Sequence, residues 1–146
     1  MFIAYNNDLI TEVANTEEEL LQKLQCRAYT SIEETDVEYQ LYGNEYLTVE
    51  EIAQKEQERT AKLHLTRGDV FRGLLQAKGV TRTQLRAMIE AMPDGIDKEM
   101  ALIDFDEALE FYRGVALIDT VGTALGITSN QMTEFFETND YQKLST

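Results

Sequence analysis

The segment from residue 96 to residue 112, IDKEMALIDFDEALEFY, constrains the fold of this chain more than any other. At helical spacing its apolar side chains would form two adjoining stripes, made up of Met100 and Ile103 and of Leu102, Phe105, Leu109 and Tyr112. Only a narrow acidic edge is left, which consists of Glu99, Asp106 and Glu110. A helix that is apolar over more than half of its circumference needs neighbours on several sides. We therefore predict one helix over 96–112, buried at the centre of a helical domain.

A short sequence phrase occurs twice, once on each side of this segment. The copies begin at Gly79 and Gly126 and share the order Gly, β-branched residue, Thr, two variable residues, Gln, apolar residue, two variable residues, two apolar residues and Glu. In each copy the Gly is suited to end one helix, and the Thr with the Gln three residues later is suited to cap the next. We predict a near-repeat of two helical corners flanking the buried helix.

The phrase also resembles a helix-turn-helix, whose second helix can enter the DNA major groove. In the first copy that helix would expose Arg82, Thr83 and Arg86, which suit contact with phosphates or bases. The second copy offers no positive charge at the corresponding positions. We therefore interpret both copies as joints between packed helices. Sequence-specific DNA binding by the second helix of the first copy remains an alternative.

Other start and stop signals complete a five-helix C-terminal domain over residues 65–146. They predict helices over about 66–78, 81–91, 116–125 and 128–138, in addition to the central one. The tail over 139–146 is expected to fray, although Tyr141 and Leu144 could dock it.

Residues 1–47 are expected to form a small β-hairpin region with one helix. Apolar runs on either side of Asn6-Asn7-Asp8 predict one hairpin, and alternation over 37–47 with a turn at Gly43-Asn44 predicts another. Between them Thr16 is suited to cap a helix over 17–25 that would cover a sheet shared by both hairpins. A capping box at Thr48 then starts a mostly polar linker helix over 48–64. The predicted class is α+β, mainly α.

The net charge of −14 argues against a general binder of nucleic acid or anionic membranes, because the protein's field would repel both. Residues 1–65 carry −9 of this charge. A candidate acidic face consists of Glu17, Glu18, Glu19, Glu33, Glu34 and Asp36. Between Arg67 and Glu90 the sign reverses to a net +3. The candidate interaction residues of that basic segment are Arg67, Arg72, Lys78, Arg82 and Arg86.

No residue set indicates a catalytic reaction. The single Cys26 excludes an internal disulfide, and the single His64 has no serine, cysteine or acid at a recognisable spacing. Acidic pairs in the central helix could chelate a divalent cation, but a solvated acidic face is the better interpretation of Asp104, Asp106, Glu107 and Glu110. We expect no enzymatic activity, no cofactor and no metal. No apolar run is long enough to span a bilayer, and we expect a soluble cytoplasmic protein that could associate with a virion.

Three stretches resemble small uncharacterised proteins encoded in the tail and structural modules of phages and prophages. They are HLTRGDVFRGL from His64, the IDFD and FYRG motifs between Ile103 and Gly114, and YGNEYLTVEEIAQ from Tyr42. The resemblance implies a phage origin and a protein-binding role, and it assigns no catalytic residue.

We accordingly predict a non-enzymatic, phage-encoded accessory or assembly protein that acts through protein–protein contacts. The partner would be a phage structural protein or a host enzyme, and the oligomeric state is left open. One alternative is an acidic inhibitor that mimics nucleic acid and occupies a host nucleic-acid enzyme, which predicts salt-sensitive binding. A third is a helix-turn-helix regulator that reads DNA through Arg82 and Arg86.

Overall fold

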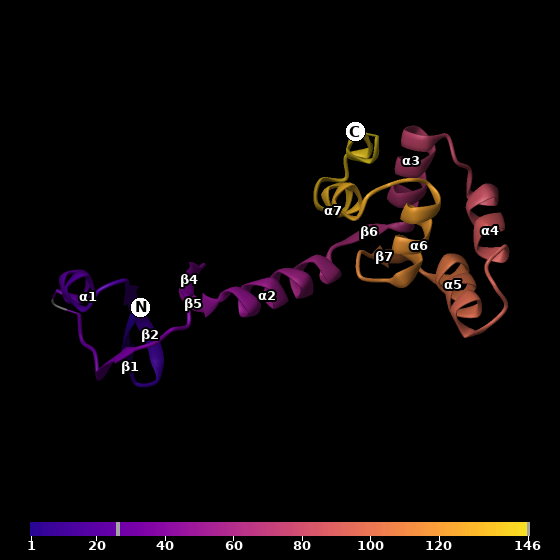
Figure 1. The fold of residues 1–146 in the computed structure, drawn as a ribbon. Coiled ribbons are helices and arrows are strands. Elements are labelled where there is room, and N and C mark those ends of the chain that lie inside the picture. Colours follow the sequence, from indigo (N-terminus) through magenta and orange to yellow (C-terminus); the bar gives the residue numbers. More distant parts are fainter. Residues whose placement is uncertain (26, 146) are drawn as a thin grey trace. The chain divides into compact units, whose positions relative to one another are not determined.

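The computed structural model describes residues 1–25 and 27–145, so Cys26 and the inference drawn from it lie outside the described residues. The chain divides into two compact units, residues 1–57 and 58–146. The division falls inside α2 (Val49–Lys62), the helix that the sequence predicted as a linker, and none of its side chains is buried. Helices predominate and the sheets are small and antiparallel (Figure 1), which confirms the mixed, mainly helical class.

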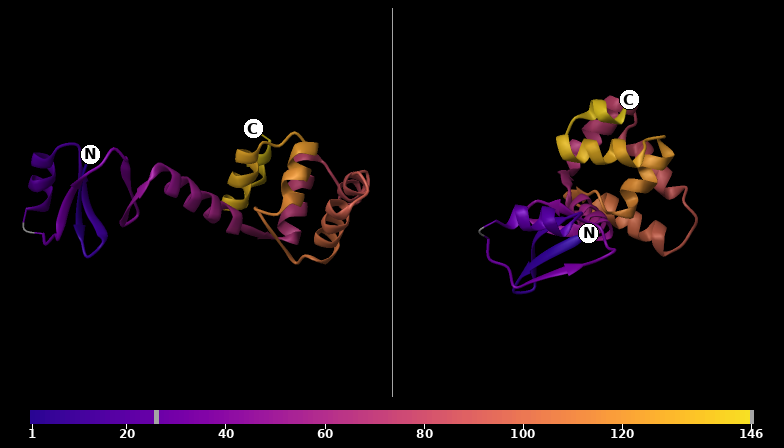
Figure 2. Two further views of the ribbon diagram at one scale, coloured as in Figure 1. Left: turned by 60° about the horizontal axis from the view of Figure 1, so that its bottom comes forward. Right: turned by 60° about the vertical axis from the view of Figure 1, so that its left-hand side comes forward.

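The first unit is built around a three-stranded sheet. Its strands lie in the order β2-β1-β3. The predicted first hairpin is confirmed, with Asn7 and Asp8 in the turn at φ 50° and 68°. The predicted helix is also confirmed: it is capped by Thr16 and packs beside the sheet, as the indigo helix in Figure 2 shows. The bounds are β1 (Phe2–Asn6), β2 (Leu9–Ala14), α1 (Glu17–Leu24) and β3 (Ser31–Glu34).

The second hairpin forms its own two-stranded sheet, from β4 (Tyr39–Tyr42) and β5 (Glu45–Thr48). The prediction that both hairpins share one sheet is therefore wrong. The free edge of β1 is paired instead by β3, a strand that was not predicted, in a register that sets Ile32 beside Ala4. Ile32 thereby packs against the small core formed by Ala4, Ala14, Leu20 and Leu24.

The second unit contains two short paired strands and the remaining helices. Among the described residues its core consists of sixteen buried apolar residues, drawn from both strands, the five helices α3–α7, the C-terminal turn and, at Ile127, the loop between α6 and α7. Strands β6 and β7 pair antiparallel in a two-stranded sheet. The bounds are β6 (His64–Thr66), α3 (Arg67–Lys78), α4 (Arg82–Glu90), α5 (Ile96–Glu107), β7 (Glu110–Tyr112), α6 (Ala116–Ala124), α7 (Ser129–Thr138) and the 3-10 turn η1 (Tyr141–Leu144).

The helix ends follow the predicted local chemistry. In the two copies of the repeated phrase, Thr81 with Gln84 and Thr128 with Gln131 form complete capping boxes, as predicted. The glycines that open the copies both adopt a left-handed conformation, with φ of 66° and 67°, which a side chain would disfavour. Each copy therefore turns the chain between two helices by the same local means.

The predicted helix over 96–112 is wrong in its length and in its burial. The helix ends at Glu107, and the next residues form β7, which pairs with β6. This pairing buries Phe111 and is flanked by backbone hydrogen bonds from Arg67 to Leu109 and from Arg113 to Leu63. A long-range strand pair thus outweighs the local helical periodicity of the segment. Of the two predicted apolar stripes, the one formed by Met100 and Ile103 lies on the surface, whereas Phe105 of the other is buried.

The prediction that the C-terminal tail frays is also wrong. Residues 141–144 form the η1 turn, which contacts α3 and α7. The side chain of Leu144 is fully buried, whereas Tyr141 is 38 % exposed. Burial of one apolar side chain against two helices explains why this short segment is ordered.

Candidate protein-interaction surface

Three large apolar side chains lie exposed in a row along α5. Ile96 is 81 % exposed, Met100 54 % and Ile103 55 %. Their spacing of four and then three residues places them on one side of the helix. We call this row the α5 stripe. Solvent-exposed apolar residues are ordinary when scattered, but a row along one helix face marks an interaction site more often.

Acidic side chains border the α5 stripe on both sides. If Ile96 and Ile103 are assigned to position d of a heptad and Met100 to position a, Asp97 and Asp104 occupy position e. Glu99 and Asp106 then occupy position g. All four positions that flank the apolar seam are therefore acidic. Within the described residues, Asp97, Glu99 and Asp104 form no ion pair, so their charge is available to a partner.

The opposite side of α5 is held by the core of the second unit. Ala101 and Phe105, which occupy positions b and f of the same heptad, are buried in that core. Figure 1 shows α5 at the edge of this unit beside α4, and it also contacts α6. The helix is thus anchored on one face and presents the α5 stripe on the other.

Polar contacts fix both ends of α5. Near its start Lys98 forms an ion pair with Asp94 over 2.8 Å, which raises the pKa of Lys98 and lowers that of Asp94 through their hydrogen bond. Near its end the Asp106 carboxylate accepts a hydrogen bond from Arg86 of α4. The Asp106 carbonyl accepts from Arg67 Nη1 over 2.7 Å. The hydrogen bonds to Asp106 and then Glu90 raise the pKa of Arg86.

Three of the five predicted basic residues gather beside this end of α5. The guanidinium carbons of Arg67 and Arg82 both lie within 6.0 Å of the centroids of the Phe71 and Phe105 rings. The two rings pack against each other with centroids 5.3 Å apart. Arg67 and Arg86 are occupied by bonds to α5, and only Arg82 has neither an ion pair nor a hydrogen bond among the described residues. This group therefore chiefly fastens α3, α4 and α5 together.

The other two basic residues lie elsewhere. Arg72 forms an ion pair with Asp69 one helical turn earlier on α3, over 2.6 Å. Lys78 is exposed at the last position of α3, next to the Gly79 that ends the helix. The structure thus brings the predicted basic segment together only in part.

The candidate acidic residues of the first unit do not share one surface. Glu17, Glu18 and Glu19 form the first turn of α1, where their charge is favourable for the helix dipole. Glu33 and Glu34 are neighbours in β3, and successive residues of a strand lie on opposite faces of the sheet. Asp36 follows β3 and is exposed.

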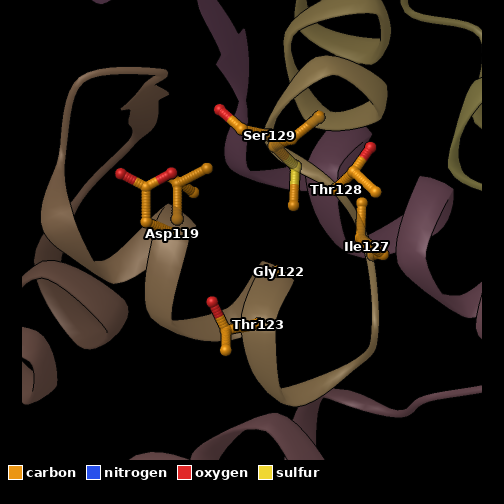
Figure 3. Close-up of a pocket in the computed structure, with 8 residues that line it drawn as sticks. Asp119, Gly122, Thr123, Ile127, Thr128 and Ser129 are labelled. Carbon is orange, nitrogen blue, oxygen red and sulfur yellow. The ribbon is translucent and has the colours of Figure 1, made fainter.

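A pocket of about 300 Å³ lies between α6 and the start of α7 (Figure 3). Asp119, Thr123, Thr128 and Ser129 contribute polar atoms to its wall. Its charged group, Asp119, already accepts a hydrogen bond from Arg113. The wall is therefore part of the structural network around Arg113, and we assign it no ligand.

Sequence reasoning missed the α5 stripe as a surface, and it missed Arg113. Arg113 is only 5 % exposed and also donates to Ser129 Oγ over 2.8 Å and to Thr133 Oγ1 over 3.1 Å. The acidic residues that flank the stripe can be recognised in the sequence. The sequence does not show which side of the helix faces water. For Arg113 no spacing signal points to its distant partners in α7.

Other features of the described residues bear on the class of function. They contain no group of three or more His, Cys, Asp or Glu side chains placed to hold a metal ion. No helix among them has the length and apolar character needed to cross a membrane. Comparisons of the chain with protein families, with curated proteins and with solved structures returned no match.

Proposed function

We propose that this chain is a non-enzymatic, phage-encoded accessory or assembly protein that binds another protein through the α5 stripe. The observation that carries the proposal is the exposure of Ile96, Met100 and Ile103 in one row on a helix whose other side is anchored in the core. Burial of such side chains is the main favourable term in protein association. The phage origin rests on the sequence resemblance described above.

The test is affinity capture from lysates of infected and uninfected bacterial cells, with identification of the bound proteins by mass spectrometry. The bait is the full chain, used in parallel with a double variant, Met100→Gln and Ile103→Gln. Glutamine has a helix propensity close to that of methionine, so α5 should stay folded while losing its apolar surface. Leu75→Gln, which changes an exposed apolar residue of α3, is the matched control.

We expect a virion structural protein to bind the wild type and the Leu75 variant and to be absent from the α5 double variant. Retention of the same partner by the double variant would refute the α5 stripe as the binding surface. Failure to enrich any virion protein from infected cells would refute the assembly role.

A second candidate function is inhibition of a host nucleic-acid enzyme by the acidic first unit. Residues 1–57 carry thirteen acidic and three basic side chains, a net charge of −10. Among them Glu12, Glu19 and Glu45 are engaged in ion pairs with Lys or Arg. A host nuclease that binds at low salt and is released at high salt would favour this function, because exposed charges are screened by salt. Such binding should also be unaffected by the Met100→Gln and Ile103→Gln changes in α5, whereas binding through the α5 stripe should be lost.

A further inference from the structure

The heptad pattern of α5 specifies the kind of partner more closely than its apolar character alone. Resting on the proposed function, we infer that α5 pairs with a basic amphipathic helix of the partner protein, in the manner of a two-helix coiled coil. The α5 stripe would form the apolar seam. The acids on its flanks would face Lys or Arg at positions e and g of the partner helix.

Spacing favours a helix as the occupant. Ile96, Met100 and Ile103 follow each other at intervals of four and three residues, which is the d–a–d spacing of a coiled-coil seam. The residues at b and f, Ala101 and Phe105, point away from that seam and are buried. A partner helix can therefore lie along α5 without disturbing the packing that holds it.

Charge selects against a second copy of this chain. In a parallel pair, position g of one helix faces position e of the other, and in an antiparallel pair g faces g and e faces e. Asp97, Glu99, Asp104 and Asp106 occupy all of these positions, so either arrangement would set acid against acid. In a parallel pair the two Glu107 side chains at position a would also face each other, which adds to the repulsion.

The basic side chains near α5 do not neutralise these flanks. Arg86 engages Asp106 and Glu90, and Lys98 is paired with Asp94 and has only a weaker coulombic interaction with Glu99. Arg67 and Arg82 lie over the Phe71 and Phe105 rings, at the end of α5 where Asp106 is already paired. The unpaired acids are Asp97, Glu99 and Asp104, which span the length of the stripe, so complementary charge must come from the partner.

The probes are two synthetic peptides that share Ile at position a and Leu at position d. One carries Lys at every e and g position and the other carries Glu there. Each is titrated into the isotope-labelled full chain, and binding is followed by amide chemical shifts and by calorimetry at low and moderate salt. We expect the basic peptide to bind with shift changes confined to α5 and its neighbours, and the acidic peptide to bind at least roughly tenfold more weakly.

Two sets of substitutions test the contributions of the apolar seam and of the acidic flanks to peptide binding separately. Met100→Gln with Ile103→Gln should weaken binding of the basic peptide by roughly tenfold or more, whereas Leu75→Gln should leave it unchanged. The triple change Asp97→Lys, Glu99→Lys and Asp104→Lys should invert the preference toward the acidic peptide. The charge-matched control is Glu33→Lys, Glu34→Lys and Asp36→Lys in the first unit, which should keep the preference for the basic peptide.

Several outcomes would overturn the inference. Equal binding of the basic peptide to wild type and to the Met100/Ile103 variant would show general attraction to an acidic protein. A dimer in sedimentation experiments that this variant abolishes would identify a second copy as the occupant. A third outcome is that the same variant loses a virion partner while neither peptide binds the wild type. This result would refute only the basic helix as partner and would agree with the proposed function.

Discussion

The buried guanidinium of Arg113 donates a hydrogen bond to the Asp119 carboxylate over 2.8 Å, and this pair joins the end of β7 to α6. Further bonds from Arg113 reach Ser129 and Thr133 of α7. A single side chain therefore connects three elements of the second unit. A buried charge is costly unless it has an ion-pair partner and hydrogen bonds. The Arg113 guanidinium has an ion pair with Asp119 and hydrogen bonds to Ser129 and Thr133.

We predict that Arg113→Ala lowers the free energy of unfolding by about 3 kcal/mol, because it removes packing and several hydrogen bonds to a charged group. Urea denaturation followed by circular dichroism measures the effect. Arg72→Ala is the control, since the Arg72 side chain is exposed and its surface ion pair with Asp69 should contribute far less to stability. Equal effects of the two changes would contradict a structural role for Arg113.

Gly73 permits the close approach of α3 to Phe135. A Cβ atom at this position would lie 2.4 Å from Cζ of the Phe135 ring, which is itself buried. Gly73→Ala should therefore destabilise the protein by about 1–3 kcal/mol, despite the better helix propensity of alanine. Gly68→Ala in the same helix meets only the flexible end of Arg72 at 3.4 Å and should change stability by less than about 0.5 kcal/mol. Thermal unfolding of both variants compares them, and the reverse order would refute the contact.

Leu144 should stabilise the second unit although it lies near the end of the described chain. Its side chain is fully buried in the core, so Leu144→Ala should cost about 2–4 kcal/mol. Tyr141→Ala, in the same turn but partly exposed, should cost less. Hydrogen exchange of the α3 and α7 amides provides a second readout, because loss of the η1 contact should speed their exchange. Unchanged stability of the Leu144 variant would support the fraying tail that the sequence suggested.

Tyr46 makes the first unit sensitive to alkaline pH. Burial, and then the hydrogen bond from its hydroxyl to Glu12 over 2.6 Å, raises the pKa of Tyr46 from 10.0 to about 12. The fold favours the neutral phenol, so this contribution to stability is fully present below pH 10 and is lost as the pH rises from 10 to about 12. The stability difference between wild type and Tyr46→Phe should therefore shift in favour of the variant across that interval.

Titration of the tyrosinate absorbance tests the same contact directly. In the wild type the Tyr46 phenol should ionise near pH 12, and this ionisation should be missing from Tyr46→Phe. Glu12→Gln should move that ionisation back toward 10, because it removes the carboxylate that opposes the tyrosinate charge. An unchanged titration of the Glu12 variant would show that burial alone shifts the pKa.

Short-range chemistry decided where the helices begin and how the tight turns are made. Thr16, Thr81 and Thr128 cap helices as predicted, and Thr66 caps α3 in the same way, because each accepts a hydrogen bond from an amide three residues away. Asn7 and Asp8 form the first hairpin turn because both tolerate positive φ. These interactions need only a few neighbouring residues, so the linear sequence contains all the information that they require.

Long-range contacts decided the features on which the proposed function depends. The strand pair β6–β7 ends α5 at Glu107 against its own periodicity, and β3, not the second hairpin, completes the sheet of the first unit. Helical spacing shows that Ile96, Met100 and Ile103 share one side of α5, but not whether core or solvent lies there. Only the packing of Ala101 and Phe105 turns that stripe outward, because a helix with two apolar sides can bury either one until its neighbours are in place.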